Sequence, residues 1–167
     1  MEAQPKVSTC LWFDTQAEEA AKLYVSLLPG SRVTSVSRYG KGSPMPEGTP
    51  MVVTFELAGT PYMGLNGGPH FKHSEACSIV VSCETQDEID RLWAALLADG
   101  GKEQRCFWLK DRFGLSWQIV PSQMGEWMNN PDPVAAARVF SVMMGQVKPD
   151  VAALEAAFQG RSGDELH

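Results

Sequence analysis

Long apolar runs are missing from this chain of 167 residues. No stretch approaches the roughly 18 uninterrupted apolar residues that a membrane-spanning helix requires. The N-terminus has no basic start followed by an apolar run, so we expect no secretory signal. Basic residues are also scarce, with 14 Lys and Arg against 20 Asp and Glu, whereas a nucleic-acid groove needs them in clusters. We therefore expect a cytoplasmic protein that binds neither membranes nor nucleic acids.

Cysteine is rare as well: the chain has four, and none of them forms a CxxC pair. Cys77 and Cys83 lie in what reads as one strand, roughly 20 Å apart at about 3.3 Å per residue, which is too far for a disulfide. We expect Cys10, Cys77, Cys83 and Cys106 to be reduced and buried. The 44% hydrophobic content excludes disorder. No Ser-His-Asp or paired-carboxylate signature emerges.

Two segments of the chain begin a helix in the same way. Thr15-Gln16-Ala17-Glu18 and Thr85-Gln86-Asp87-Glu88 both fit the capping box, in which the Thr hydroxyl accepts a hydrogen bond from the backbone three residues on. An apolar helical face and a Gly stop follow each cap. The caps repeat at an offset of 70 residues and the helical faces at 69, so one inserted residue reconciles them.

Strand-like runs flank both helices in the same order. They are 7–13, 31–39, 51–57 and 61–65 in the first half, and 77–83, 102–105, 107–110 and 115–120 in the second. Both halves read βαβββ, so we predict an α+β fold in which modules 7–66 and 76–121 form one paired domain, 7–121. Neither half can cover its own apolar sheet face. A cupped, barrel-like mixed β-sheet that encloses a pocket between the modules is therefore expected.

The remaining segment, 122–160, is predicted to be a helical tail, followed by a frayed terminus at 161–167. Asp132 and Pro133 supply an N-cap and a first-turn proline for one helix. A second helix starts at Asp150. Such short helices must pack on something, either their own barrel or a second subunit.

Four stretches carry a resemblance to a known family: Cys10-Leu11-Trp12-Phe13-Asp14, Phe55-Glu56-Leu57-Ala58-Gly59, Met63-Gly64-Leu65-Asn66-Gly67-Gly68-Pro69 and Trp108-Leu109-Lys110-Asp111-Arg112-Phe113-Gly114-Leu115-Ser116-Trp117-Gln118. With the paired βαβββ plan, they resemble the PhnB-like branch of the vicinal oxygen chelate superfamily. This superfamily includes glyoxalase I, extradiol dioxygenases and antibiotic-resistance proteins of the bleomycin type. Members of the branch are often labelled 3-demethylubiquinone-9 3-methyltransferase.

That label implies a methyl transfer, which the glycine pattern does not support. A nucleotide-type cofactor is usually held by a Gly-rich turn between a strand and a helix, with an acidic residue further on. The only dense glycine cluster near a strand, 64–68, leads into Pro69-His70-Phe71-Lys72 and not into a periodic helix. We therefore reject the methyltransferase interpretation and expect no cofactor.

The resemblance also implies a metal site. In metal-using relatives, His, Glu or Gln side chains from the first strand of each half and from later strands hold the ion. Matched to that pattern, the first-strand position falls on Thr9, its second-half counterpart on Ser78 and the last-strand position on Gln118, with 64–66 near the fourth. Thr, Ser and Asn scarcely replace imidazole and carboxylate. We expect no metal at these positions.

Other chemically capable side chains have ordinary interpretations. His70 and His73, followed by Glu75, could hold a metal in the linker between the modules, but HxxH without a further defined ligand is a weak signal. The rest are expected to be structural: Glu56 solvated, Asp14 supporting a helix start, and Lys110, Asp111 and Arg112 forming an exposed, salt-bridged turn. We assign no catalytic residue.

What remains is a pocket lined by apolar and small polar side chains, as small organic ligands require. Strand alternation places Thr9, Leu11 and Phe13 on one side, and likewise Ser116 and Gln118. The opposite sides leave Trp12 and Trp117 outward, where the tail helices or another subunit would cover them. The predicted pocket residues are Thr9, Leu11, Phe13, Asn66, Ser78, Val80, Ser116 and Gln118.

These observations favour a homodimer that binds a small aromatic or amphipathic organic molecule in its cup, without metal. Two alternatives stay open. One is a metal-dependent lyase, isomerase or dioxygenase with a remodelled site. The other is a dimeric structural protein with a filled cup.

Overall fold

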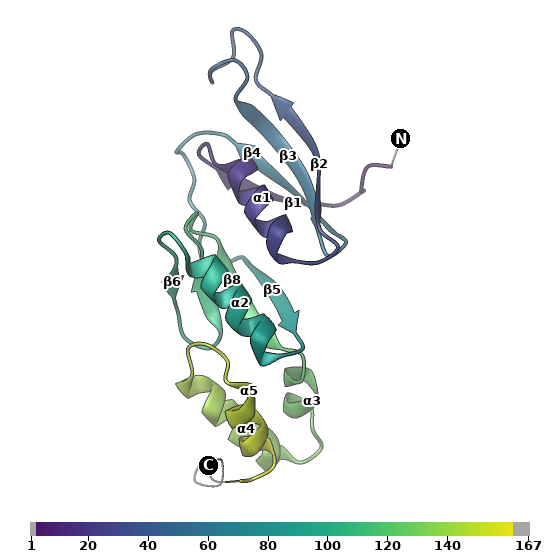
Figure 1. The fold of residues 1–167 in the computed structure, drawn as a ribbon, viewed down its shortest axis with the longest axis vertical. Helices are drawn as coiled ribbons and strands as arrows, with labels where there is room; N and C mark the ends of the chain where they lie inside the picture. Colours follow the sequence, from purple (N-terminus) through teal and green to yellow (C-terminus); the bar gives the residue numbers. More distant parts are fainter. Residues whose placement is uncertain (1–2, 162–167) are drawn as a thin grey trace. The chain divides into compact units, whose positions relative to one another are not determined.

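A computed structural model describes residues 3–161 of the chain, which divide into two compact units, Met1–His73 and Ser74–His167. Each unit contains one four-stranded sheet, and neither sheet closes on itself. The fold is therefore α+β, as predicted (Figure 1). Apart from Arg161, the terminus expected to be frayed lies outside the described residues.

The first unit has the predicted βαβββ order. Its elements are β1 (Thr9–Phe13), α1 (Ala17–Leu27), β2 (Arg32–Arg38), β3 (Pro50–Leu57) and β4 (Thr60–Asn66). The strands lie in the order β1-β4-β3-β2, with β1 parallel to β4 and the other neighbours antiparallel. A tight turn connects β3 to β4, where Ala58 and Gly59 both have positive φ.

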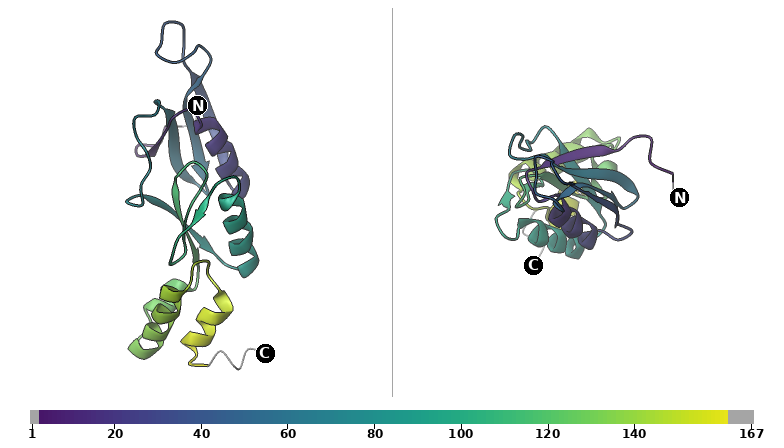
Figure 2. Two further views of the ribbon diagram at one scale, coloured as in Figure 1. Left: turned by 90° about the vertical axis from the view of Figure 1, so that its left-hand side faces the viewer. Right: turned by 90° about the horizontal axis from the view of Figure 1, so that it is seen from above.

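Helix α1 covers one face of this first sheet (Figure 2). Its Tyr24 ring is fully buried and lies 6.4 Å from the ring of Phe55. Gly64 of β4 lies directly under the helix, because a Cβ built there would be 3.1 Å from the Cβ of Ala17. A side chain at position 64 would therefore press on Ala17 and require a shift of a few tenths of an ångström.

The capping box predicted at Thr15 is wrong. The N-cap of α1 is Gln16, and no side chain of that cap accepts a hydrogen bond. Instead, the backbone N–H of Ala17 donates to Oδ1 of Asn66 at 2.9 Å, across 49 positions of sequence. The Nδ2 of Asn66 donates to the Pro50 carbonyl at 3.0 Å. The buried side-chain amide of Asn66 in β4 thus accepts a hydrogen bond from an N–H group at the start of α1, where the N-cap residue supplies no acceptor.

The second unit repeats the order of elements. They are β5 (Ser78–Cys83), α2 (Gln86–Leu97), β6 (Lys102–Glu103), β7 (Trp108–Lys110) and β8 (Ser116–Pro121), with strands in the order β5-β8-β7-β6. Here the predicted capping box is confirmed. The Thr85 hydroxyl accepts from the Glu88 N–H at 3.2 Å, and the Glu88 carboxylate accepts from the Glu84 N–H at 2.9 Å.

Helix α2 covers one face of the second sheet, and Trp117 lies on that face. Trp117 is 1% exposed, and Ile119 and Leu109 beside it are fully buried. The indole Nε1 of Trp117 donates to Oδ2 of Asp111 at 2.9 Å. Trp117 therefore lies on the face opposite Ser116 and Gln118, as strand alternation indicated, but α2 covers it, and not the tail helices or another subunit that we had expected.

The tail forms three helices, α3 (Met124–Met128), α4 (Pro133–Gly145) and α5 (Val151–Phe158). The N-cap predicted at Asp132 and the helix start predicted at Asp150 are confirmed, because both carboxylates cap a helix by accepting from the Val134 N–H and the Ala153 N–H at 3.0 Å. The short helix α3 was not predicted. None of the helices in residues 3–161 is long and apolar enough to span a bilayer.

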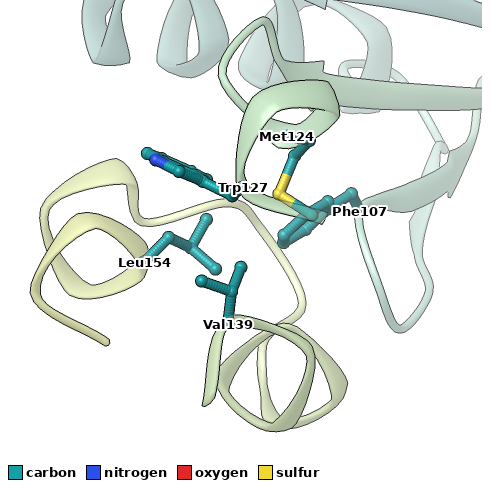
Figure 3. Packing of buried hydrophobic residues seen from close by; sticks show 5 residues of the cluster. All are labelled: Phe107, Met124, Trp127, Val139 and Leu154. Atoms are coloured by element: carbon teal, nitrogen blue, oxygen red, sulfur yellow. The ribbon is translucent and has the colours of Figure 1, made fainter. Parts of the chain in front are cut away.

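The tail packs on its own unit. Its core contains Phe107, Met124, Trp127, Val139 and Leu154 (Figure 3), and Val120 of β8 packs against this cluster. Cys106 and Phe107 both have positive φ, 57° and 74°, which is uncommon for residues with a Cβ. Their N–H groups donate to the Gln146 and Val147 carbonyls at 3.0 and 2.9 Å. The loop after α4 thus holds this bend in place.

Candidate functional site

The face of the second sheet opposite α2, which we call the helix-free face of that sheet, carries a polar pair. Ser78 lies opposite Ser116 and Val80 opposite Gln118 in the parallel β5–β8 ladder. The Gln118 Nε2 donates to the Ser78 Oγ at 2.8 Å. All four predicted pocket residues of this module therefore lie on one face, as strand alternation indicated.

Ser116 has an unusual environment on this face. It is fully buried, and its Oγ has no hydrogen-bond partner among residues 3–161. Leaving a buried hydroxyl unpaired costs about 1–3 kcal/mol. A polar group that reached this atom would gain a hydrogen bond, but the residues that bury Ser116 must first move aside.

An ion pair borders this face. Lys110 lies opposite Ser116 in the ladder, and its Nζ pairs with Oε1 of Glu75. Gln104 Nε2 also donates to that oxygen, at 3.1 Å. These contacts, chiefly the hydrogen bond from Lys110, lower the pKa of Glu75 to about 2. Glu75 is therefore a carboxylate at neutral pH and is poorly suited to act as a base there.

The first unit places its predicted pocket residues differently. Leu11 and Phe13 are 3% and 4% exposed and lie on the face that α1 covers, together with the fully buried Asn66. Thr9 lies on the same side by strand alternation and is exposed at the start of β1. Leu11, Phe13 and Asn66 thus build the core of their unit and do not lie on its helix-free face.

The register explains this difference. Phe13 pairs with Asn66 in the first sheet and Cys83 with Pro121 in the second, so these pairs occupy equivalent positions. Counting back five residues from Phe13 and Cys83 makes Ser8 the counterpart of Ser78. The strands thus follow the 70-residue offset of the caps, and not the 69-residue offset that links Thr9 to Ser78. Likewise, Met63 is the counterpart of Gln118.

The structure has a pocket at this equivalent position of the first unit, which sequence reasoning missed. Its volume is about 150 Å³, and its lining includes Ser8, Thr54, Glu56 and Met63, together with the chain at residues 3–5. The 70-residue repeat of the caps is the signal that could have located it. A pocket of this size accommodates part of an organic molecule, since pockets for drug-sized ligands usually span about 300–1,000 Å³.

Trp12 is covered within its own unit. Its Nε1 donates to the Gly68 carbonyl at 2.9 Å, and its ring meets the edge of Phe71 with centroids 4.8 Å apart. A Cβ at Gly67 would overlap the Trp12 ring. The segment after β4 therefore covers Trp12, whereas we had expected the tail helices or another subunit to cover it.

The remaining acid and base candidates have structural roles. Glu56 is partly exposed and paired with Arg32 at 3.2 Å, while its neighbours Phe55 and Leu57 are buried, which confirms that it is solvated. Asp111, expected in an exposed turn, is 2% exposed. Its Oδ1 accepts from the N–H groups of Phe113 and Leu115 at 2.9 and 3.1 Å.

The four cysteines form no disulfide. Only Cys83 is buried, whereas Cys10 and Cys77 are exposed, so the expectation of general burial is wrong. Burial raises the pKa of the Cys83 thiol to about 12 and also raises the pKa of Cys10. Neither group is an activated thiolate at neutral pH.

The donor set does not fit the metal that the resemblance implies. The corrected positions are Ser8 and Met63 in the first unit and Ser78 and Gln118 in the second: two hydroxyls, a thioether and an amide. Divalent ions in such sites prefer imidazole and carboxylate. Residues 3–161 contain no group of three or more His, Cys, Asp or Glu side chains that could hold an ion, which includes the loop with His70 and His73.

Comparison with known proteins gives consistent matches. Residues 5–120 match the family described as 3-demethylubiquinone-9 3-methyltransferase. A PhnB protein from Bacillus cereus, described in the same words, is 35% identical, with a TM-score of 0.64 over 70% of this chain and 99% of its own. Protein PA1353 from Pseudomonas aeruginosa is 23% identical, with a TM-score of 0.58 over 71% of this chain and 98% of its own.

The fold extends to more distant structures. The fosfomycin resistance protein FosX from Mesorhizobium loti is 11% identical, with a TM-score of 0.51 over 75% of this chain and 96% of its own. A comparison with curated proteins finds no match. The family match ends at residue 120, before α3 begins at Met124.

Proposed function

Because the chain belongs to the 3-demethylubiquinone-9 3-methyltransferase family, the PhnB-like branch of the vicinal oxygen chelate superfamily, we propose that it binds a small organic molecule without a metal ion. The molecule has an aromatic or aliphatic body and an oxygen-bearing group that can accept and donate hydrogen bonds. Its polar group is held on the helix-free face of the second sheet, by Ser78, Ser116 and Gln118.

The Oγ atom of Ser116 supports this proposal most directly. It is buried and has no partner among the described residues, and it lies directly opposite Ser78, which accepts a hydrogen bond from Gln118. A protein with a filled core gains nothing from an unpaired hydroxyl at this position, because the group loses its water without compensation. A ligand group that bonds to Ser116 removes that cost, which favours binding.

Methyl transfer, as named by the family description, is not part of this proposal. The glycines at 64–68 serve packing and turn formation: Gly64 makes room for α1, Gly67 for the Trp12 ring, and Gly68 adopts a φ of 88°. None of them opens a helix, whereas a nucleotide-binding turn would place its glycines between a strand and a helix N-terminus.

We propose that the protein acts in the cytoplasm, where free cysteines such as the exposed Cys10 and Cys77 stay reduced. The metal-dependent alternative lacks support from the donor set, since Ser, Met and Gln side chains replace the expected ligands. A thermal-shift comparison of wild type with Ser116→Ala distinguishes the proposed ligand site from the alternative of a structural protein with a filled cup.

Ser116→Ala is expected to change two quantities in opposite directions. Without ligand, its melting temperature should rise by a few degrees, because the variant no longer buries an unpaired hydroxyl. A panel of aromatic and amphipathic carboxylic acids, amides and phenols is screened against wild type by thermal shift. A probe at 100 times its Kd should add about 2.7 kcal/mol to the stability of wild type. Ser116→Ala should bind that probe at least about tenfold more weakly.

Ser122→Ala is the matched control, because it removes an exposed hydroxyl just beyond β8. It should match wild type in both stability and affinity. If no probe stabilises wild type, or if Ser116→Ala binds the probe as wild type does, the proposed site is wrong and the filled-core alternative is favoured.

A further inference from the structure

The helix-free face of the second sheet carries two lysines, Lys102 and Lys110, beside the polar residues of the candidate site. We propose that Lys110 selects an aromatic carboxylic acid as the ligand, whose carboxylate displaces the Glu75 side chain from Lys110. This choice of ligand rests on the proposed function, because it concerns the same site. Of the acids, amides and phenols that the site could hold, it singles out the acids.

The charges on the strands of this sheet favour an anion. Lys110 pairs with Ser116 across β7 and β8, and Lys102 pairs with Lys110 across β6 and β7. Directly paired residues point to the same side of a sheet, so both lysines lie on the helix-free face. Glu103 lies on the α2 side, where its Oε1 accepts from the Trp93 indole at 2.8 Å. Although the chain has a net charge of −6, its strands present positive charge here, which attracts an anionic ligand.

The Glu75 side chain shows how a carboxylate binds at this place. Its Oε1 pairs with the Lys110 ammonium and accepts from Gln104 Nε2 at 3.1 Å. Glu75 lies in the loop before β5, and its side chain is 53% exposed. An ion pair with so exposed a partner adds little to stability. A ligand carboxylate can therefore replace Glu75 on the same two donors at little cost to the fold.

Two buried atoms next to this ion pair have no hydrogen-bond partner within residues 3–161. They are the Oγ of Ser116, whose residue lies opposite Lys110, and the Oε1 of Gln104. A serine hydroxyl can donate to a carboxylate oxygen, whereas an amide oxygen only accepts. A carboxylic acid that also carries a hydroxyl group would pair with both atoms, which Glu75 leaves unpaired.

An aromatic body fits beside the lysines. Trp108 pairs with Gln118 on the helix-free face, and it precedes Lys110 by two residues on β7, so both point to the same side. The Trp108 side chain is half-buried. The ring of an aromatic acid can stack on the indole or meet its edge while the carboxylate reaches Lys110.

Calorimetric titration of the full chain with 3-phenyllactate and 3-phenyllactamide tests the choice of ligand, because the two probes differ in the charge of the group that faces Lys110. Wild type should bind the acid at least about tenfold more tightly than the amide, since a charge-assisted hydrogen bond is the stronger one. Lys110→Met should bring the two affinities within about threefold of each other. Circular dichroism reports whether each variant is folded.

Glu75→Gln changes the affinity in the other direction. It should bind 3-phenyllactate at least about threefold more tightly than wild type does, because no carboxylate of the loop then competes for Lys110. An unchanged or weaker affinity of the folded variant would show that the ligand does not displace Glu75, and would overturn the proposal.

Lys148→Met is the matched control for Lys110→Met. Lys148 also forms an ion pair, with Asp90 of α2 at 2.8 Å, on the opposite side of the sheet. The variant should keep the wild-type preference for the acid. The proposal is overturned if wild type binds neither probe, if it binds the amide as tightly as the acid, or if folded Lys110→Met keeps the tenfold preference. The proposed function survives these results as long as some probe of the wider panel binds in a manner that depends on Ser116.

Discussion

Asp111→Ala is expected to lower the free energy of unfolding of the second unit by about 4 kcal/mol. The Asp111 carboxylate is 2% exposed and accepts three hydrogen bonds, from the N–H groups of Phe113 and Leu115 and from the Trp117 indole. Removing it leaves three donors without their acceptor in the turn between β7 and β8. Urea unfolding monitored by tryptophan fluorescence measures the loss, since four of the five tryptophans lie in this unit.

Asp87→Ala is the matched control for this prediction, because Asp87 is exposed in the first turn of α2. It should cost at most about 1 kcal/mol, through the helix dipole alone. Asp111→Asn should fall between the two, because it keeps an acceptor for the backbone N–H groups but turns an amide donor toward the Trp117 indole N–H. Equal stabilities for Asp111→Ala and Asp87→Ala would show that the buried carboxylate does not hold the turn.

Asn66→Leu is expected to destabilise the first unit by about 3 kcal/mol. The change removes the acceptor for the Ala17 N–H and the donor to the Pro50 carbonyl, so both groups lose the buried amide that pairs with them. Native-state hydrogen exchange measures the effect residue by residue, and the amides of α1 should lose protection first. Fluorescence of Trp12, the single tryptophan of this unit, gives a second readout.

Asn129→Leu provides the comparison for Asn66→Leu. The Asn129 side chain is exposed and donates to the Gly125 carbonyl at 2.8 Å, where water can replace the bond. Its loss should cost less than about 1 kcal/mol. If Asn66→Leu is equally mild, the helix N-terminus does not depend on β4.

The order of elements follows from local signals in the sequence. The apolar strand runs, the Thr85 capping box and the Asp132 and Asp150 caps all act over a few residues, and the structure confirms each of them. The cap of α1 could not be predicted in this way, because Asn66 reaches it from β4 across 49 positions. Likewise, Trp117 looks uncovered until α2 is placed over its side of the sheet.

The residues of the candidate site could be predicted in the second unit but not in the first, because the strand register assumed for β1 was wrong by one residue. On β5 and β8, the choice of Ser78 fixes the face for Val80, Ser116 and Gln118, and the structure places all four together. On β1, a shift of one residue exchanges the two faces of the strand. Taking Thr9 in place of Ser8 therefore selected Leu11 and Phe13, which lie under α1. The pocket at Ser8 and Met63 depends on the long-range pairing of β1 with β4.

The equivalent positions of both sheets, at Ser8, Met63, Ser78 and Gln118, carry no ionic metal ligand, and the proposed function depends on this. The metal content of protein purified without added chelator, after dialysis, tests it most directly. Mass spectrometry of the elements should find divalent transition metal well below one ion per chain, below about 0.1. A Ser78→His/Gln118→Glu variant should gain affinity for Zn²⁺ that wild type lacks, because it supplies an imidazole and a carboxylate on neighbouring strands. One tightly held divalent ion per wild-type chain would show that the protein binds a metal after all.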